Sequence, residues 1–219
     1  MLLLTTTRDA LLAPLQSVSG IVEKRHTLPI LSNVLIEKHG DALTLIATDI
    51  EIQITTHQIS QGGGEASITI GARKLQDILR ALPDGEVSLV LDDKRVTLKS
   101  GKSRYALQTL PATDYPRMQL NSGESLTVRL PQKDFRRQLA QVAYAMAAQD
   151  IRYYLNGLLM QVMGNERRMV ATDGHRLALS SNTLEEEFAK TEVILPRKTV
   201  LELTRQLGDT EDPVEIVIT

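Results

Sequence analysis

The chain has 219 residues, of which 42% are hydrophobic, and 25 Lys and Arg against 27 Asp and Glu leave a net charge of −2. It has no cysteine, which excludes disulfide bonds, thiolate nucleophiles and cysteine-ligated metal sites. No apolar run approaches the roughly 20 residues of a membrane-spanning helix, and a net charge this close to zero does not by itself predict a nucleic-acid partner.

The first half of the chain predicts two helices. Thr6 is the expected N-cap of the first, with Asp9 three residues later as in a capping box. The apolar residues of this helix recur at helical spacing: Leu11, Leu12, Leu15, Val18 and Val22. A second helix is expected from Ala72 to the breaker Pro83-Asp84-Gly85. Alternating apolar residues between turns predict strands at residues 1–5, 30–37, 42–47, 50–56, 66–70, 87–91, 95–99 and 104–109.

Residues 111–125, rich in Pro, Asn, Ser and Gly, predict a linker to a second half. Pro131 suits the first turn of a helix whose expected core face is Phe135, Leu139, Val142 and Met146. The last helix is expected to begin near Pro196 and to end at Gly208, with the apolar residues Val200, Leu201 and Leu207. Strands are expected at residues 126–130, 151–162, 168–171, after Arg176 and at 214–219, with a solvated loop at 185–187.

The second half repeats the first at an offset of 124 residues. Ala47-Thr48-Asp49 returns as Ala171-Thr172-Asp173, and residues 11–18 align with residues 135–142. The same offset takes residues 71–75 to residues 195–199. One unit of domain size is therefore used twice in the same order.

These elements predict an α+β protein of two domains, residues 1–120 and 126–219, each with a largely antiparallel sheet and two helices. The second copy lacks counterparts of the two strands at residues 95–99 and 104–109. We therefore expect a piece of a longer protein, with the second domain truncated and one edge of its sheet unpaired.

The helices are more basic than the rest of the chain. Residues 72–82, 131–147 and 196–207 each carry a net charge of +2 within a chain of net charge −2. A positive helix surface suits contacts with a phosphate backbone that do not depend on base sequence. The alternative interpretation is that these Lys and Arg side chains only solvate the outer faces of the helices.

The stretch from Ala171 to Leu177 admits three interpretations. Asp173 and His175 could act in acid–base chemistry, although no nucleophile motif surrounds the nearby Ser180 and Ser181. Asp173-Gly174 could instead form only a turn. The third interpretation is a peptide pocket lined by Leu155, Thr172 and Leu177, with Arg152 and Arg176 at its rim.

Two other kinds of site find little support. The histidines, His26, His39, His57 and His175, are scattered without the spacing of metal ligands. Gly62-Gly63-Gly64 lacks the strand–glycine–helix context and the lysine of a phosphate-binding loop. We therefore expect no metal and no cofactor.

Four motifs together resemble the bacterial DNA polymerase III β subunit family of sliding clamps. They are residues 27–31 (TLPIL), 152–157 (RYYLNG), 171–177 (ATDGHRL) and 196–198 (PRK), and the likeness runs in order through all 219 residues. The resemblance implies three similar domains per chain and two chains closing head to tail into a ring. The helices would line the hole, and this chain would supply the first domain and most of the second.

The resemblance also implies roles for individual residues. The implied DNA contacts are Lys24, Arg25, Arg73, Gln149, Arg152, Tyr153, Tyr154 and Lys198, with Lys74 a weaker candidate. The implied half of a pocket for partner peptides is Arg152, Leu155, Thr172, Gly174, His175, Arg176 and Leu177. The implied subunit interface is Lys74, Leu75, Ile78, Leu82, Tyr105 and Leu107.

By this resemblance the protein is a cytoplasmic, non-catalytic processivity factor that forms a homodimeric ring in its full-length form and does not bind membranes. Its partners would be duplex DNA, DNA polymerase III subunits, the clamp loader and other proteins with a clamp-binding motif. Two rival classes stay open on the residues alone, a monomeric protein-interaction module and an enzyme that depends on Asp173 or His175.

Overall fold

The computed structural model describes residues 1–22, 28–60, 62–92, 95–119, 123 and 125–219. The chain divides into two compact units, Met1–Gln119 and Leu120–Thr219. Each unit is built from antiparallel strands and two α-helices. Within the described residues, none of the helices is both long and apolar enough to span a bilayer.

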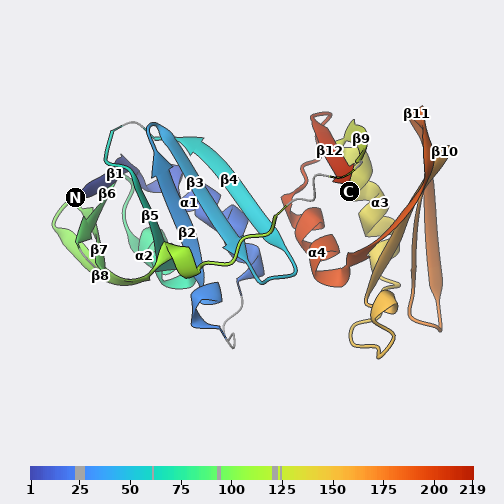
Figure 1. Cartoon of the computed structure of the whole chain (residues 1–219), viewed down its shortest axis with the longest axis horizontal. Helices are drawn as coiled ribbons and strands as arrows, with labels where there is room; N and C mark the ends of the chain where they lie inside the picture. The colour runs from blue at the N-terminus through green and yellow to red at the C-terminus, as the bar shows by residue number, and fades with distance from the viewer. Residues whose placement is uncertain (23–27, 61, 93–94, 120–122, 124) are drawn as a thin grey trace. The chain divides into compact units, whose positions relative to one another are not determined.

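The first unit is an eight-stranded sheet with two helices on one of its faces (Figure 1). Its strand order is β1-β6-β7-β8-β5-β2-β3-β4, and every neighbouring pair is antiparallel. The helices are α1 (Arg8–Val18) and α2 (Ala72–Ala81). The strands are β1 (Leu2–Thr7), β2 (Asn33–His39), β3 (Ala42–Thr48), β4 (Gln53–Ile59), β5 (Ala66–Gly71), β6 (Glu86–Asp92), β7 (Arg95–Ser100) and β8 (Ser103–Leu110).

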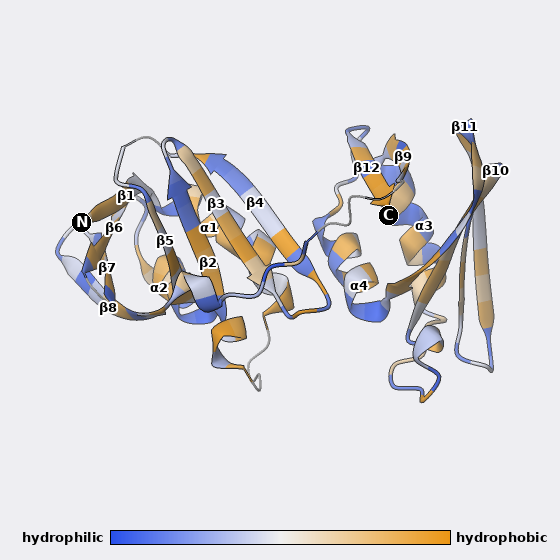
Figure 2. Ribbon diagram, viewed as in Figure 1, coloured by the Kyte–Doolittle hydropathy of each residue, from blue (hydrophilic) through white to orange (hydrophobic). Residues whose placement is uncertain are grey.

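The core of this unit lies between the helices and one sheet face. Leu11, Leu15 and Val18 of α1 are fully buried, as their helical spacing predicts. On β2 the side chains of Val34 and Ile36 join this core, whereas Leu35 between them points to the opposite face and packs in a separate cluster. Figure 2 shows the apolar colouring of β2 and β3 that results from having both faces partly covered.

Three predictions in the first unit are wrong in detail. Strand β1 runs through Thr6, so the N-cap of α1 is Thr7, whose hydroxyl accepts a hydrogen bond from the Ala10 amide at 3.3 Å. The strand expected from residue 30 is preceded by a 3-10 turn, η2 (Pro29–Ser32), because Pro29 favours a helical first turn. Strand β4 begins at Gln53, since Ile50 lies in a turn at φ 82°.

The second unit contains a pair of strands, a longer two-stranded ribbon and two helices. β9 (Leu126–Pro131) pairs with β12 (Pro213–Ile218), and β10 (Gly157–Thr172) pairs with β11 (Leu177–Pro196). The helices are α3 (Gln132–Ala143) and α4 (Arg197–Gln206). All four residues of the expected α3 core face, Phe135, Leu139, Val142 and Met146, are buried against β10 and β11.

Three predictions in the second unit also need correction. Residues 151–156 form a loop with the 3-10 turn η4 (Tyr153–Leu155), so the strand begins only at Gly157. Residues 185–187 are exposed but lie within β11 and are not a loop. Leu201 is 52% exposed, because the core contact of α4 is made by Val200.

The repeat is visible in the backbone. Gly40 and Gly164, 124 residues apart, have φ values of 55° and 59°, the first in the turn between β2 and β3 and the second at an irregularity within β10. The 3-10 turns η2 and η4 each bury one leucine at the same offset, Leu31 and Leu155. The offset becomes 125 at α2 and α4, where the C-caps are Leu82 and Leu207. Arg73 therefore corresponds to Lys198 in the structure, whereas the offset of 124 pairs it with Arg197 in the sequence.

The sharpest structural match is the turn that follows β3 and β10. In the first unit the Asp49 carboxylate accepts hydrogen bonds from the amides of residues 51 and 52, at 3.1 and 2.8 Å. In the second unit Asp173 accepts from the amides of residues 175 and 176, both at 3.0 Å. The residue that follows the aspartate is Ile50 in the first turn, with φ 82°, and Gly174 in the second, with φ 88°.

The first part of the expected linker is not free. Residues 112–114 form the 3-10 turn η3 (Ala112–Asp114), and Tyr115 is only 5% exposed on the first unit. Its hydroxyl accepts from the Thr48 amide at 3.2 Å and lies 3.2 and 3.3 Å from the carbonyls of Asn33 and Ile46, to which it can donate. Burial raises the pKa of Tyr115 to about 12, so the hydroxyl keeps its proton at neutral pH.

We predict that Ile50→Gly stabilises the protein. A β-branched residue in the left-handed region costs about 1–2 kcal/mol, and the greater freedom of glycine in the unfolded chain offsets roughly 0.5–1 kcal/mol of the gain. The free energy of unfolding, measured by urea denaturation, should rise by about 0.5–1 kcal/mol. The mirror variant Gly174→Ile should lower it, and a change of the same sign in both variants would contradict the explanation.

Candidate functional site

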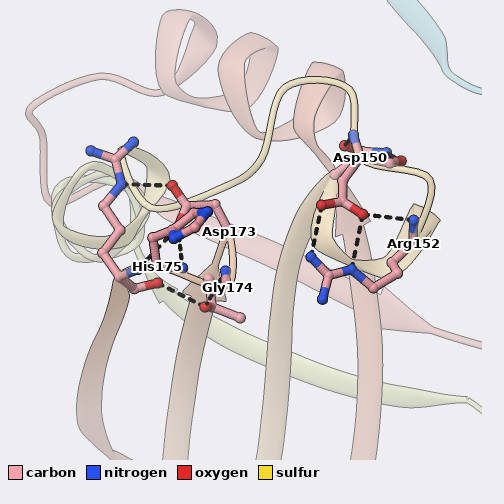
Figure 3. A network of polar contacts seen from close by, with 8 residues as sticks. Asp150, Arg152, Asp173, Gly174 and His175 are labelled. Atoms are coloured by element: carbon pink, nitrogen blue, oxygen red, sulfur yellow. Dashed lines mark hydrogen bonds and ion pairs between the residues drawn. The ribbon is translucent and has the colours of Figure 1, made fainter.

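Two loops of the second unit carry most of the candidate residues, and both are held by a carboxylate (Figure 3). In the first loop Asp150 accepts hydrogen bonds from the Arg152 amide at 2.8 Å and from Nε and Nη2 of its guanidinium, both at 2.9 Å. Asn156 ties the two ends of this loop together through two 2.8 Å hydrogen bonds with the Asp150 backbone. The side-chain and backbone donors of Arg152 hold the pKa of Asp150 at about 2.

In the second loop Asp173 is occupied by the turn. Its carboxylate accepts from the backbone amides of His175 and Arg176 and from Arg176 Nε at 3.0 Å. The backbone hydrogen bond from His175, followed by that from Arg176, lowers the pKa of Asp173. Thr172 Oγ1 adds a 2.7 Å bond to the Arg176 carbonyl. Because the Asp173 carboxylate contacts the His175 backbone, the geometry favours a structural turn over an acid–base pair.

The serines near this loop do not complete a hydrolytic site. Ser180 Oγ donates to Gln141 Oε1 at 2.7 Å, which places its hydrogen bond on α3. Within the described part of the chain, no three His, Asp or Glu side chains gather in a way that could hold a metal ion.

The two loops meet at Gly174. A Cβ atom added there would lie 3.3 Å from Arg152 Nη2, so the guanidinium of the first loop packs directly against the glycine of the second. Glycine is also the residue that φ 88° favours. Arg152 is therefore fixed from two sides, by the carboxylate of Asp150 and by the backbone of Gly174.

A hollow of about 460 Å³ opens beside these loops. Of the residues implied by the family resemblance, Gln149, His175 and Arg176 line it. The remaining lining residues include Tyr144, Asp150 and Arg197, which the sequence did not single out. The guanidinium carbon of Arg176 lies 5.7 Å from the centre of the Tyr144 ring, a distance at which a cation is attracted to an aromatic face. Tyr144 follows α3, so its place beside this loop depends on the tertiary structure.

The other implied pocket residues lie on the same two loops but do not line this hollow. Leu155 is 7% exposed, Thr172 is half-buried and Leu177 is 62% exposed at the start of β11. Thr172 and Leu177 are paired across the ribbon, so their side chains share one face. Thr172 and Leu177 are thus neighbours across the ribbon, whereas Leu155 belongs to the loop that begins at Arg152.

The implied DNA contacts are mostly on the surface. Tyr153 and Tyr154 are 79% and 49% exposed, with their rings in an edge-to-face contact at 5.8 Å. Gln149, Arg152 and Arg73 are exposed, and Lys198 is half-buried on α4. Arg73 also donates to the Val22 carbonyl at 2.9 Å, which holds its guanidinium near α1. Lys24 and Arg25 lie outside the described residues.

The residues of the implied subunit interface differ in exposure. Leu75, Leu82 and Leu107 are 0%, 4% and 2% exposed and belong to the core of the first unit. Lys74 and Tyr105 are exposed and Ile78 is half-buried, so a contact at this place would be made by these three.

We predict that the Asp150–Arg152 ion pair persists at pH values well below the usual pKa of an aspartate carboxyl group. A carboxylate whose pKa is lowered by folding stabilises the folded state fully at pH values above its unfolded pKa of about 4. This stabilisation is lost as the pH falls through the pKa of the folded state, which for Asp150 is about 2. NMR titration of the Asp150 carboxyl should give that midpoint. In Arg152→Ala the midpoint should move up, while that of Asp173 should stay in place. An unchanged Asp150 midpoint would refute the pairing.

Comparison with known proteins gives a consistent result along the chain. Family models for the DNA polymerase III beta subunit match residues 2–119 with its N-terminal domain and residues 129–219 with its central domain. The beta sliding clamp of Pseudomonas putida KT2440 is 46% identical over 217 residues, which cover 98% of this chain and 59% of that protein. The beta sliding clamp of Escherichia coli K12 is 41% identical over 216 residues, with the same coverage.

Solved structures agree with the sequences. A sliding clamp from Pseudomonas aeruginosa bound to griselimycin has a TM-score of 0.93 at 42% identity and covers 99% of this chain and 59% of that one. A DNA polymerase sliding clamp from Caulobacter crescentus has a TM-score of 0.91 at 38% identity, covering 99% and 60%. The chain spans about 59% of the length of its curated relatives, and it belongs to the DNA polymerase III beta subunit family of sliding clamps.

Proposed function

We propose that this chain forms part of a sliding clamp, a non-catalytic ring that encircles duplex DNA and tethers replication and repair proteins to it. The observation that carries the proposal is the match of both units, in order, to consecutive domains of the family. A tether raises the local concentration of its partners at the template without taking part in their chemistry. The protein would act in the cytoplasm, as a homodimer of chains with the relatives' full length, loaded by a clamp loader.

The charges on the helices support contact with DNA. Arg73, Lys74 and Arg80 are exposed on α2, and Arg136 is exposed on α3. Two other basic residues have acidic partners three positions earlier on their own helix, Arg137 at 2.9 Å from Asp134 and Arg205 beside Glu202. Such pairs add little net charge, so we expect the exposed residues on α2 and Arg136 to make most of the contacts with DNA phosphates. Phosphate contacts of this kind do not read base sequence and would allow a ring to slide.

The rim formed by Leu155, Thr172 and Leu177 supports peptide binding. It offers apolar surface beside Arg152 and Arg176, whose guanidinium groups are held by Asp150 and Asp173 at 2.9 and 3.0 Å. Because each guanidinium is paired with a carboxylate, it adds little net charge, and an apolar rim between such fixed polar groups suits a short peptide with apolar residues. Polymerase subunits and other clamp-binding proteins would present such peptides, and griselimycin, which a similar clamp binds, would occupy the same rim.

The ring is tested with a chain of the relatives' full length that carries this sequence, loaded onto circular DNA by a clamp loader. We expect retention that survives high salt but ends when the DNA is linearised, because the link is topological. Retention that falls smoothly with salt and ignores linearisation would identify an ordinary electrostatic DNA binder. A protein-interaction module without a DNA role would not be retained at all.

The peptide rim is tested by Leu177→Ala. In a chain of the relatives' full length, removing most of an exposed leucine that becomes buried on binding should weaken griselimycin binding about tenfold or more, measured by calorimetry. Leu201→Ala is the matched control, because Leu201 is similarly exposed, at 52%, but lies on α4. Equal losses in the two variants would count against the rim.

A further inference from the structure

Tyr144 follows the last turn of α3 and keeps its ring at the surface. It is 59% exposed, whereas its neighbours Val142, Ala145 and Met146 are 0%, 0% and 3% exposed. The amides of Ala145 and Met146 donate to the carbonyls of Val142 and Ala143, at 3.0 and 3.3 Å. A buried turn therefore fixes the backbone at Tyr144, and the exposed ring has a defined place.

The ring contacts a cation of the turn that follows β10. The guanidinium carbon of Arg176 lies over it, 5.7 Å from the ring centre, and Nε of the same guanidinium donates to the Asp173 carboxylate at 3.0 Å. The Arg176 side chain is 57% exposed, and among the described residues its two Nη atoms have no hydrogen-bond partner. The guanidinium is thus held by a ring and a carboxylate, and two of its donor groups stay accessible.

A second contact joins α3 to the start of β11. Gln141 precedes Tyr144 by three residues and so shares its face of the helix. Its Oε1 accepts a hydrogen bond from Ser180 Oγ at 2.7 Å, and Ser180 follows Arg176 by four residues. The end of α3 therefore meets this region at two successive points, one a neutral hydrogen bond and the other a contact between a cation and a ring.

The first unit has the same turn without the cation or the ring. At the offset of 124, Ile52 corresponds to Arg176 and Gly20 corresponds to Tyr144. The aspartate of the first-unit turn nevertheless accepts hydrogen bonds from two amides of that turn, at 3.1 and 2.8 Å. The backbone of the turn therefore forms without a contact of this kind. The contact between Tyr144 and Arg176 acts instead on the surface that the second turn carries.

That surface includes the proposed peptide rim, because Leu177 directly follows Arg176. A mobile side chain must be ordered when a ligand binds, which lowers the affinity. A guanidinium that is already held presents its donors without this cost. Its two Nη groups suit an acceptor oxygen, which a peptide offers in its backbone carbonyls.

We propose that Tyr144 is a positioning residue of the peptide rim and acts through Arg176. Its ring holds the guanidinium beside Leu177, so that the two Nη groups are available to an acceptor oxygen of a bound peptide. Tyr144 itself does not touch the peptide. This role rests on the proposed function, whereas the contact between Tyr144 and Arg176 does not.

The contact is tested by NMR in this chain. Protons held over an aromatic ring are shifted upfield, so we expect upfield Hδ and Hε signals of Arg176 in wild type and in Tyr144→Phe, which keeps a ring. In Tyr144→Leu these signals should return to the usual positions of arginine. Ser180→Ala is the matched control, because it removes the other contact of α3 and keeps the ring. Unchanged signals in Tyr144→Leu, or an equal change in Ser180→Ala, would overturn the proposal.

The effect on binding is tested in a chain of the relatives' full length, with griselimycin as the probe. Tyr144→Leu should weaken binding about threefold in calorimetry, because the guanidinium must then be ordered by the ligand. Tyr144→Phe and Ser180→Ala should bind as wild type does. An equal loss in Ser180→Ala would show a general effect of loosening α3 and would refute the role of the ring.

A double-mutant cycle separates positioning from direct contact. In the Arg176→Ala background, Tyr144→Leu should have no further effect on griselimycin affinity, since the ring acts only through the guanidinium. A further loss of the same size would mean that Tyr144 contacts the ligand itself, which contradicts the proposal. Failure of wild type to bind griselimycin would remove the proposed rim together with this role. Failure of the cycle with wild-type binding intact would remove only the role of Tyr144.

Discussion

The burial of one helix face against one sheet face is the constraint on which both units depend. In the first unit Leu11, Leu15 and Leu75 meet this requirement, and in the second their counterparts are Phe135, Leu139 and Val200, all nearly or fully buried. Two helices cover only one face of an antiparallel sheet. The opposite face must therefore be solvated, covered by a further segment or used for binding, and in the first unit Tyr115 packs on it.

In the described part of the second unit, Leu177 and Leu179 are exposed on β11. An exposed apolar surface beside two fixed guanidinium groups is costly for a protein that has no use for it. Leu177 is also one of the residues for which the family resemblance implies a role in a peptide site.

The turn after β3 and β10 shows how little backbone change the divergence between the copies needed. Both turns have the same carboxylate acceptor and the same threonine hydroxyl contacts, at nearly the same distances. The first turn keeps an isoleucine at φ 82°, whereas the second has a glycine that also allows Arg152 to pack against it. The side chains changed around a turn whose geometry the aspartate already determined.

The sequence by itself determined the repeat, the class of the fold, most helices and strands, and the family, because apolar periodicity and the Ala-Thr-Asp motif are local signals. The tertiary structure alone decided which apolar residues of the last helix are core and which are surface, as the buried Val200 and the exposed Leu201 show, since spacing does not reveal what covers a face. It also decided the partner of Tyr115 and the place of Tyr144, because these contacts join residues far apart in the chain. Burial and long-range hydrogen bonds are properties of the folded arrangement, so no window of neighbouring residues could have revealed them.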